Sequence, residues 1–145
     1  MVTIKSGTWF EVRYKYDKTT EDGMMKKATE TSVFLADNFK EAYEKATEYL
    51  YKYMSGEFDV VGMKIAPYTC VIQSEDGEYY YRVKVSFISL DEKSGKEKKT
   101  PCSYLVEANN VEQARRITDD YCTESMYDTE IESVFATKIT DVLCD

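Results

Sequence analysis

Two stretches of the sequence place aromatic and basic side chains on alternate positions. The residues concerned are Trp9, Arg13, Lys15, Tyr80, Arg82 and Lys84. Alternate residues of a β-strand project from the same face of a sheet, so each set would share one face. Sheets that bind single-stranded nucleic acid use this combination, because rings stack on bases and cations contact phosphates. The same face could instead be an interface, between the two halves of the chain or between subunits, or a solvated surface.

The sequence contains no histidine, which limits the chemistry that the chain can perform. The commonest general base and the commonest transition-metal ligand are both missing, so Ser-His, Cys-His and His-zinc sites are excluded. Cys70, Cys102, Cys122 and Cys144 are widely spaced, and we interpret them as reduced structural residues. Phosphate-binding glycine motifs and a nucleophile elbow are also missing. We therefore expect no enzymatic activity, no catalytic residues, no cofactor and no metal site.

Charged residues gather in two further places, near the expected turns and in the last third of the chain. The lysines are Lys26, Lys27, Lys93, Lys96, Lys98 and Lys99, and the acids are Asp119, Asp120, Glu124, Asp128, Glu130 and Glu132. Contact with an anion, calcium binding and mimicry of nucleic acid are compatible with these sets. Solvated surfaces explain them more simply, because charged turns prevent edge pairing and the acids lack the order of a calcium loop.

The two halves of the chain resemble each other in sequence. The aligned pairs include Val12 with Val83, Arg13 with Lys84 and Gly23 with Gly95, together with residues 36–42 and 108–114. Self-similarity of this kind is typical of a duplicated structural unit. We infer a single domain, residues 1–145, made of two repeats at about 8–72 and 79–142.

Each repeat predicts the order strand, turn, strand, helix, strand. The strands are expected at 9–17, 29–36 and 58–65 in the first repeat and at 80–87, 102–108 and 131–139 in the second, and residues 68–73 allow a further strand. Asp22-Gly23 and Ser94-Gly95 predict the turns. Asn38 and Asn110, each followed three residues later by Glu or Gln, are typical of helix N-caps.

These elements predict an α+β fold. We expect a duplicated β-β-α-β unit with pseudo-two-fold symmetry, in which an antiparallel sheet is packed by one helix per repeat. At 145 residues the chain is long enough to bury a core without disulfides or metal ions. Whether the sheets of the two repeats merge or stack is left open by the sequence pattern.

Charge and hydropathy restrict the partners and the location. The formal net charge of −8 opposes general attraction to nucleic-acid phosphates, although it allows a local basic patch. No stretch approaches the roughly 18 consecutive apolar residues that cross a bilayer, and the first residues have no signal-peptide pattern. We expect no membrane partner and a cytoplasmic location.

Several sequence blocks resemble a family of small proteins. They are Trp9-Phe-Glu-Val-Arg-Tyr, Lys26-Lys-Ala-Thr-Glu, Phe39-Lys-Glu-Ala, Ser55-Gly-Glu-Phe, Lys98-Lys-Thr and Val106-Glu-Ala-Asn-Asn-Val. Over nearly the whole chain they are similar to a domain-of-unknown-function family from Bacteroidales, their mobile elements and their crAss-like phages. The resemblance implies an intracellular protein of phage or mobile-element association, and it transfers no catalytic residues. One departure is Ser32-Val-Phe-Leu-Ala, where the second repeat has the more regular Tyr104-Leu-Val-Glu-Ala.

The expected function is therefore binding. The first hypothesis is a non-enzymatic phage or mobile-element accessory protein that binds a macromolecular partner through the sheet face or the seam between repeats. Its partner would be a protein, or another copy of the chain, because duplicated proteins commonly form symmetric assemblies. The alternative is a nucleic-acid or nucleotide-binding protein that uses the aromatic and basic sheet face.

Overall fold

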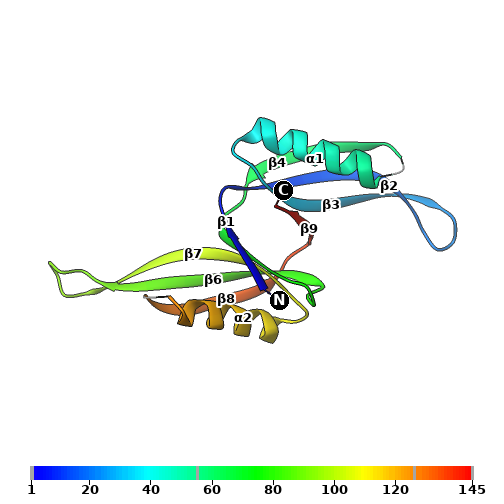
Figure 1. The fold of residues 1–145 in the computed structure, drawn as a ribbon. Helices are drawn as coiled ribbons and strands as arrows, with labels where there is room; N and C mark the ends of the chain where they lie inside the picture. The colour runs from blue at the N-terminus through cyan, green and yellow to red at the C-terminus, as the bar shows by residue number, and fades with distance from the viewer. Residues whose placement is uncertain (1, 55, 126, 145) are drawn as a thin grey trace. The chain divides into compact units, whose positions relative to one another are not determined.

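The computed structural model describes residues 2–54, 56–125 and 127–144, which form mostly strands, with two helices and two sheets. The elements are β1 (Val2–Ser6), β2 (Trp9–Thr19), β3 (Met25–Leu35), α1 (Phe39–Tyr53), β4 (Phe58–Ile65), β5 (Tyr68–Ser74), β6 (Tyr79–Leu90), β7 (Glu97–Ala108), α2 (Val111–Thr123), β8 (Asp128–Ala136) and β9 (Ile139–Leu143) (Figure 1). The expected α+β class is confirmed. Within the described residues, neither helix is long and apolar enough to cross a bilayer.

The chain forms two compact units that interleave along the sequence. Unit 1 contains Met1–Ser6 and Pro67–Thr137, and unit 2 contains Gly7–Ala66 and Lys138–Asp145. These boundaries differ from the repeats inferred at 8–72 and 79–142. The difference arises because β5 pairs with a strand of unit 1 and β9 pairs with a strand of unit 2.

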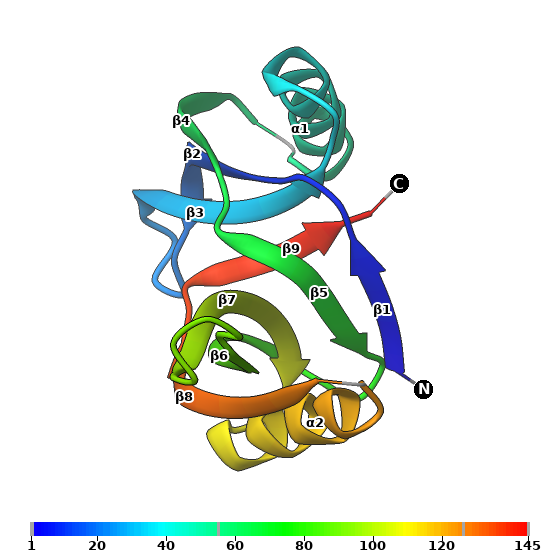
Figure 2. The ribbon, with the colours of Figure 1, turned by 90° about the vertical axis from the view of Figure 1, so that its left-hand side faces the viewer.

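Each unit has one mixed sheet. The unit 2 sheet has the order β4-β2-β3-β9, and the unit 1 sheet has the order β1-β5-β7-β6-β8 (Figure 2). The hairpins β2–β3 and β6–β7 are antiparallel, as expected. The expectation of an antiparallel sheet is wrong for one pairing in each unit, because β9 runs parallel to β3 and β5 runs parallel to β7.

The two hairpins are longer than the sequence pattern predicted. The second strands begin at Met25 and Glu97, whereas the alternation of apolar residues begins only near 29 and 102. Exposed charged side chains cover the ends of both hairpins, so the hydrogen-bonded ladder continues without the alternation that burial produces. Gly23 and Gly95 close the turns with φ of 81° and 70°, a left-handed conformation that glycine adopts readily.

Asparagine caps begin both helices, as the sequence predicted. The Asn38 side chain accepts a hydrogen bond of 2.9 Å from the backbone N–H of Glu41, and the Asn110 side chain accepts one of 2.7 Å from that of Gln113. In α2 the Gln113 side chain also accepts from the backbone N–H of Asn109, at 2.7 Å. These bonds satisfy N–H groups that have no partner within a helix.

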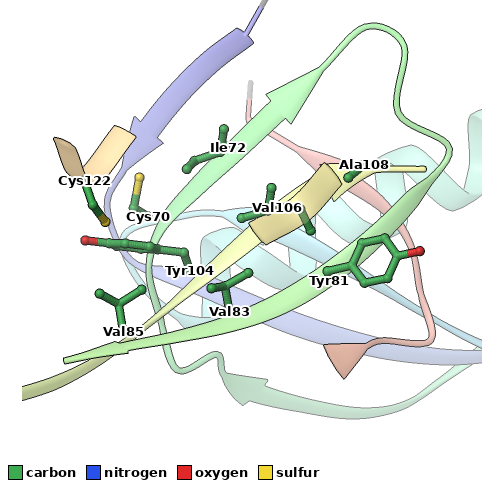
Figure 3. Packing of buried hydrophobic residues seen from close by; sticks show 10 residues of the cluster. Cys70, Ile72, Tyr81, Val83, Val85, Tyr104, Val106, Ala108 and Cys122 are labelled. Atoms are coloured by element: carbon green, nitrogen blue, oxygen red, sulfur yellow. The ribbon is translucent and has the colours of Figure 1, made fainter. Parts of the chain in front are cut away.

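Small residues on each helix allow it to lie close to its sheet. In unit 2, Ala42 and Ala46 of α1 pack on Phe10, Val12 and Phe34. The corresponding core of unit 1 has Ala114 and Cys122 of α2 and a set of strand residues, namely Cys70, Ile72, Tyr81, Val83, Val85, Tyr104 and Val106 (Figure 3). Each unit therefore has its own hydrophobic core between one helix and one sheet face.

Three strands were not predicted as they occur. The expected strand at 131–139 is two strands, β8 and β9, separated by Thr137 and Lys138. Thr137 donates from its backbone N–H to the carbonyl of Tyr80 at 3.0 Å, and the chain then leaves the unit 1 sheet. β1 was not predicted either, because its five residues are all exposed and its pairing with β5 is distant in sequence.

A substitution at Gly77 tests the close approach of the β5–β6 turn to β7. A Cβ at Gly77 would lie 2.8 Å from the backbone nitrogen of Ala108 and 2.9 Å from the carbonyl carbon of Glu107. Because backbone cannot move away cheaply, we expect Gly77→Ala to lower the free energy of unfolding by about 1–3 kcal/mol. Urea unfolding followed by circular dichroism measures this change.

Gly56→Ala is the matched control for that substitution. No atom lies within 4 Å of a Cβ built at Gly56, and its φ is not positive. We expect its unfolding free energy to stay within about 0.5 kcal/mol of the parent. Equal effects of the two substitutions would contradict the packing of this turn against β7.

Candidate functional site

The polar face of the unit 2 sheet, opposite the face covered by α1, carries the candidate site. Phe10, Val12 and Tyr14 of β2 are buried, whereas Arg13 between them is exposed. Arg13 pairs with Thr31 of β3 on one side and with Gly62 of β4 on the other. Strand alternation therefore brings side chains from three strands onto one surface.

A cleft of about 680 Å³ lies on this surface. Its lining residues are Glu11, Arg13, Thr29, Thr31, Gly62, Met63, Lys64 and Lys138. Three of these side chains are cationic, one is anionic and two are hydroxyls. The lining is therefore suited to an anionic group, which cations attract and hydroxyls hydrogen-bond.

The cations of the cleft differ in their pairing. Lys64 lies 3.3 Å from the Glu11 carboxylate, so these two charges offset each other. Arg13 and Lys138 have no salt bridge to any residue within the described ranges. Two cations with free donor groups thus remain available to a ligand.

Gly62 leaves the middle of the cleft open. The pairing between β2 and β4 shifts after Arg13, so that Arg13 faces Gly62 while Tyr14 faces Val60. No atom lies within 4 Å of a Cβ built at Gly62. Gly62 has no side chain, so the space beside Arg13 is open to a ligand. A larger residue at position 62 would occupy that space.

The aromatic and basic residues that the sequence predicted to share one face differ in their exposure in the structure. Trp9 is 0% exposed and Tyr80 is 5% exposed, so neither ring is available to stack on a base. Of the basic residues, Arg13 lines the cleft, and Lys15 lines a neighbouring depression with Asp17 and Asp59. The combination of exposed rings and cations does not occur at these positions, because the rings serve as core residues.

The remaining two basic residues lie in unit 1. Arg82 donates hydrogen bonds of 3.3 and 3.2 Å to the Ser103 hydroxyl, which fixes its guanidinium along the sheet. Lys84, the sequence counterpart of Arg13, is exposed and pairs with Ser103 and Ser133 on its neighbouring strands. Neither Arg82 nor Lys84 lines the unit 2 cleft.

Sequence reasoning missed the other polar residues of the cleft. Thr29, Thr31 and Lys64 could have been found by extending the period-two pattern of β2 to its neighbours. Lys138 could not, because its position depends on β9 joining β3 in parallel, with Ile139 beside Thr31. A pairing between residues more than one hundred positions apart leaves no local signal.

The charged sets noted in the sequence are partly paired. Lys99 of the second hairpin lies 3.0 Å from Glu130 and 4.0 Å from Glu132, and Arg115 lies 3.5 Å from Asp119. Within the described residues, no group of three or more Cys, Asp or Glu side chains is arranged to hold a metal ion. These sets therefore form cross-strand and helix-surface ion pairs.

A hydrogen-bonded network occupies the other face of the unit 2 sheet, beneath α1. Tyr14 donates to Glu30 at 3.3 Å and lies 3.0 Å from the Ser32 hydroxyl, and Tyr16 donates to Glu30 at 2.6 Å. Tyr49 of α1 donates to Asp141 of β9 at 3.0 Å. Two carboxylates and three phenols thus satisfy one another, so the network fixes the sheet and α1 in place.

Burial and hydrogen bonding keep these phenols protonated. The hydrogen bond to Glu30 is the main reason that the pKa of Tyr16 is raised to about 12. Burial is the main reason that the pKa values of Tyr14 and Tyr49 are raised, and the charge of Asp141 adds to the effect on Tyr49. None of the three is suited to act as a base or nucleophile near neutral pH.

The four cysteines form no disulfide. Burial raises the pKa values of Cys70 and Cys122, which lie in the unit 1 core near Tyr104 (Figure 3). A thiol with a raised pKa is less often ionised and hence less reactive. These two thiols act as core residues.

Comparisons with known proteins identify one family. A family model described as "Domain of unknown function (DUF4494)" matches residues 8–145. The searches of curated proteins and of solved structures found no match. The family model thus covers every residue of the cleft.

The network beneath α1 predicts loss of stability at high pH. Tyr16 titrates near pH 10 in an unfolded chain and at about 12 in the folded protein. Its contribution is therefore complete below about pH 10 and is lost as the pH rises towards about 12. We expect Tyr16→Phe to have a shallower fall in unfolding free energy over this range, measured by urea unfolding at several pH values.

Tyr43→Phe is the control, because the Tyr43 hydroxyl has no hydrogen-bond partner in the described part of the chain and Tyr43 is 49% exposed. Its pH profile should match that of the parent. Identical profiles for all three proteins would show that the Tyr16–Glu30 bond does not couple to folding.

Proposed function

This chain belongs to the DUF4494 family of domains of unknown function, and we propose that it is a non-enzymatic binding protein whose unit 2 cleft holds an acidic segment of a protein partner. The observation that carries the proposal is the presence of Arg13 and Lys138, both without a salt bridge within the described residues, beside the hydroxyls of Thr29 and Thr31. Arg13 projects from β2 and Lys138 directly precedes β9, so the backbone brings both cations to one cleft before a carboxylate binds.

The lining of the cleft favours a protein segment over a single-stranded nucleic acid. Binding of single strands depends on aromatic rings as well as cations, and no aromatic residue lines the described cleft. The net charge of −8 also repels a long polyphosphate more strongly than it repels a few carboxylates. The nucleic-acid or nucleotide alternative would rest on Arg13 and Lys138 alone.

Three features support the non-enzymatic part of the proposal. The sequence has no histidine, and the single carboxylate of the cleft, Glu11, is paired with Lys64. The phenols beneath α1 and the buried thiols have raised pKa values. Raised pKa values make these phenols and thiols poor bases near neutral pH, and the Glu11–Lys64 pair engages the carboxylate of the cleft, so these features support a binding role.

A duplication is also part of the proposal. Both units place the order β-β-α-β along the chain, and the pairing of the first strand with the last shifts after Arg13 in one and after Lys84 in the other. Asn38 and Asn110 cap the two helices with the same backbone angles. We propose that the segments from β2 to β4 and from β6 to β8 arose by duplication of one β-β-α-β segment. We also propose that the protein has an accessory role in a phage or mobile element.

Charge removal tests the cleft. We expect the double variant Arg13→Ala/Lys138→Ala to bind a fluorescein-labelled glutamate-rich peptide about tenfold or more weakly, since each charge-assisted hydrogen bond contributes about 1.5–3 kcal/mol. Fluorescence anisotropy measures the dissociation constants. Lys93→Ala/Lys96→Ala, which removes the same charge from the exposed β6–β7 turn, is the control and should bind like the parent.

The same assay with labelled oligothymidylate decides between the two hypotheses. Tighter binding of the oligonucleotide, lost in Arg13→Ala/Lys138→Ala, would replace the protein partner with a nucleic acid. Equal effects of the cleft and control variants would refute a specific site. Native mass spectrometry of the purified protein adds an independent measure, because a retained nucleotide would appear as extra mass.

Filling the cleft tests its shape. Gly62→Val places a β-branched side chain at a strand position with open space, so we expect unfolding stability equal to or above that of the parent. Binding of the glutamate-rich peptide should weaken, because the new side chain lies beside Arg13. Unchanged affinity in the folded variant would exclude the middle of the cleft from the site.

A further inference from the structure

We propose that a groove between β1 and α2 in unit 1 binds an extended cationic segment of a protein partner, which adds as a strand to the outer edge of β1. The site lies in the other unit from the cationic cleft and has the opposite charge. This proposal can therefore be tested independently of the function proposed above.

The groove has an apolar floor. It has a volume of about 280 Å³, and Val2 and Ile4 of β1, Ile72 of β5 and Ile117 of α2 line it. Val2 is 47% exposed and Ile4 is 43% exposed, although both belong to a regular strand. Aliphatic side chains left at the surface on alternate residues suit a partner strand whose own side chains alternate.

β1 also presents a strand edge. It lies at the end of the unit 1 sheet, beside β5 (Figure 2). The β1–β5 ladder runs from Val2–Ser74 to Ser6–Cys70 without a register shift, and no described strand pairs with the other edge of β1. Edge strands are commonly protected by bulges, prolines, charged residues or short length; β1 has no bulge and no proline, and its protection is limited to one lysine and a length of five residues. A regular edge of this kind is a template for β-strand addition.

The rim of the groove specifies the charge of the partner. Asp120 and Glu124 of the α2 end line the groove, and neither carboxylate has a salt bridge or hydrogen bond in the described parts of the chain. They are four residues apart, a spacing at which like charges on a helix repel. The last turn of α2 has no basic residue, so both acids also oppose the helix dipole. Lysine or arginine from a partner would relieve both effects.

An extended peptide satisfies the three features together. Its backbone continues the β1 ladder, its aliphatic side chains cover Val2 and Ile4, and its basic side chains reach Asp120 and Glu124. A negatively charged protein also attracts cationic segments at long range, which favours their encounter with the groove.

The test uses a labelled short peptide of the repeat Val-Thr-Lys-Thr, which places valine and lysine on the same face of a strand, with a Val-Thr-Glu-Thr peptide as the charge control. We expect the lysine peptide to bind in fluorescence anisotropy and the glutamate peptide not to bind. Asp120→Asn/Glu124→Gln should weaken binding of the lysine peptide about tenfold. Glu44→Gln/Glu48→Gln, which changes an exposed acidic pair of the same spacing on α1, is the matched control and should have no effect.

A second measurement tests strand addition without changing the protein. Alternate backbone N–H groups of a strand point in opposite directions, so two peptides methylated on alternate sets of nitrogens differ in one respect only. We expect one of the two to lose binding and the other to keep it. Equal binding of both methylated peptides, equal binding of the lysine and glutamate peptides, or no binding of the lysine peptide would each overturn the proposal.

A second copy of the chain is the alternative occupant of the β1 edge. If a second copy pairs with β1, sedimentation will show a mass that rises with protein concentration and that falls in Ile4→Lys. That result would assign the edge to a dimer and overturn the peptide proposal. A constant monomer mass together with binding of the lysine peptide supports it.

Discussion

Each sheet of this protein contains one parallel pair, whose two strands lie far apart in the sequence. β9 pairs with β3 and β5 pairs with β7, and in both pairs the register shifts at the start of the ladder, after Thr31 and after Tyr68. Parallel strands cannot be joined by a tight turn, so these pairings determine which residues make up each unit. The hydrogen bond from Tyr49 to Asp141, the position of Lys138 in the cleft and the support that β5 gives to β1 all depend on them.

The strands β9 and β5 pack into cores of different chemistry. In unit 2, Ser32 faces Asp141, and in unit 1, Tyr104 faces Cys70 at the corresponding point. The unit 2 position belongs to a network of carboxylates and hydroxyls, whereas the unit 1 position belongs to a core of thiols, aromatic rings and aliphatic side chains. A polar group placed in the apolar core would lose its hydrogen bonds, which is costly in a buried site. This difference therefore favours β9 in the unit 2 sheet and β5 in the unit 1 sheet over an exchange of the two strands.

The surfaces also diverge between the units. The unit 2 cleft is lined by Arg13 and Lys138, which have no salt bridge within the described residues, and the unit 1 groove is lined by Asp120 and Glu124 from the end of α2, which have none either. The backbone of each unit determines where these charges lie before any ligand arrives. The two proposed sites have opposite charge, so each would select a partner segment of a different charge.

The sequence alone determined the local elements. The alternation from Phe10 to Tyr16, the turn glycines Gly23 and Gly95 and the caps Asn38 and Asn110 depend on neighbouring residues, so the strands, turns and helices could be predicted from them. Only the tertiary structure decided the partners of β5 and β9, the burial of Trp9 and Tyr80 and the presence of Lys138 in the cleft. An aromatic residue on the polar side of a strand has the same local pattern whether it is covered or exposed. What covers it is set by contacts between segments far apart in the chain, which alternation does not encode.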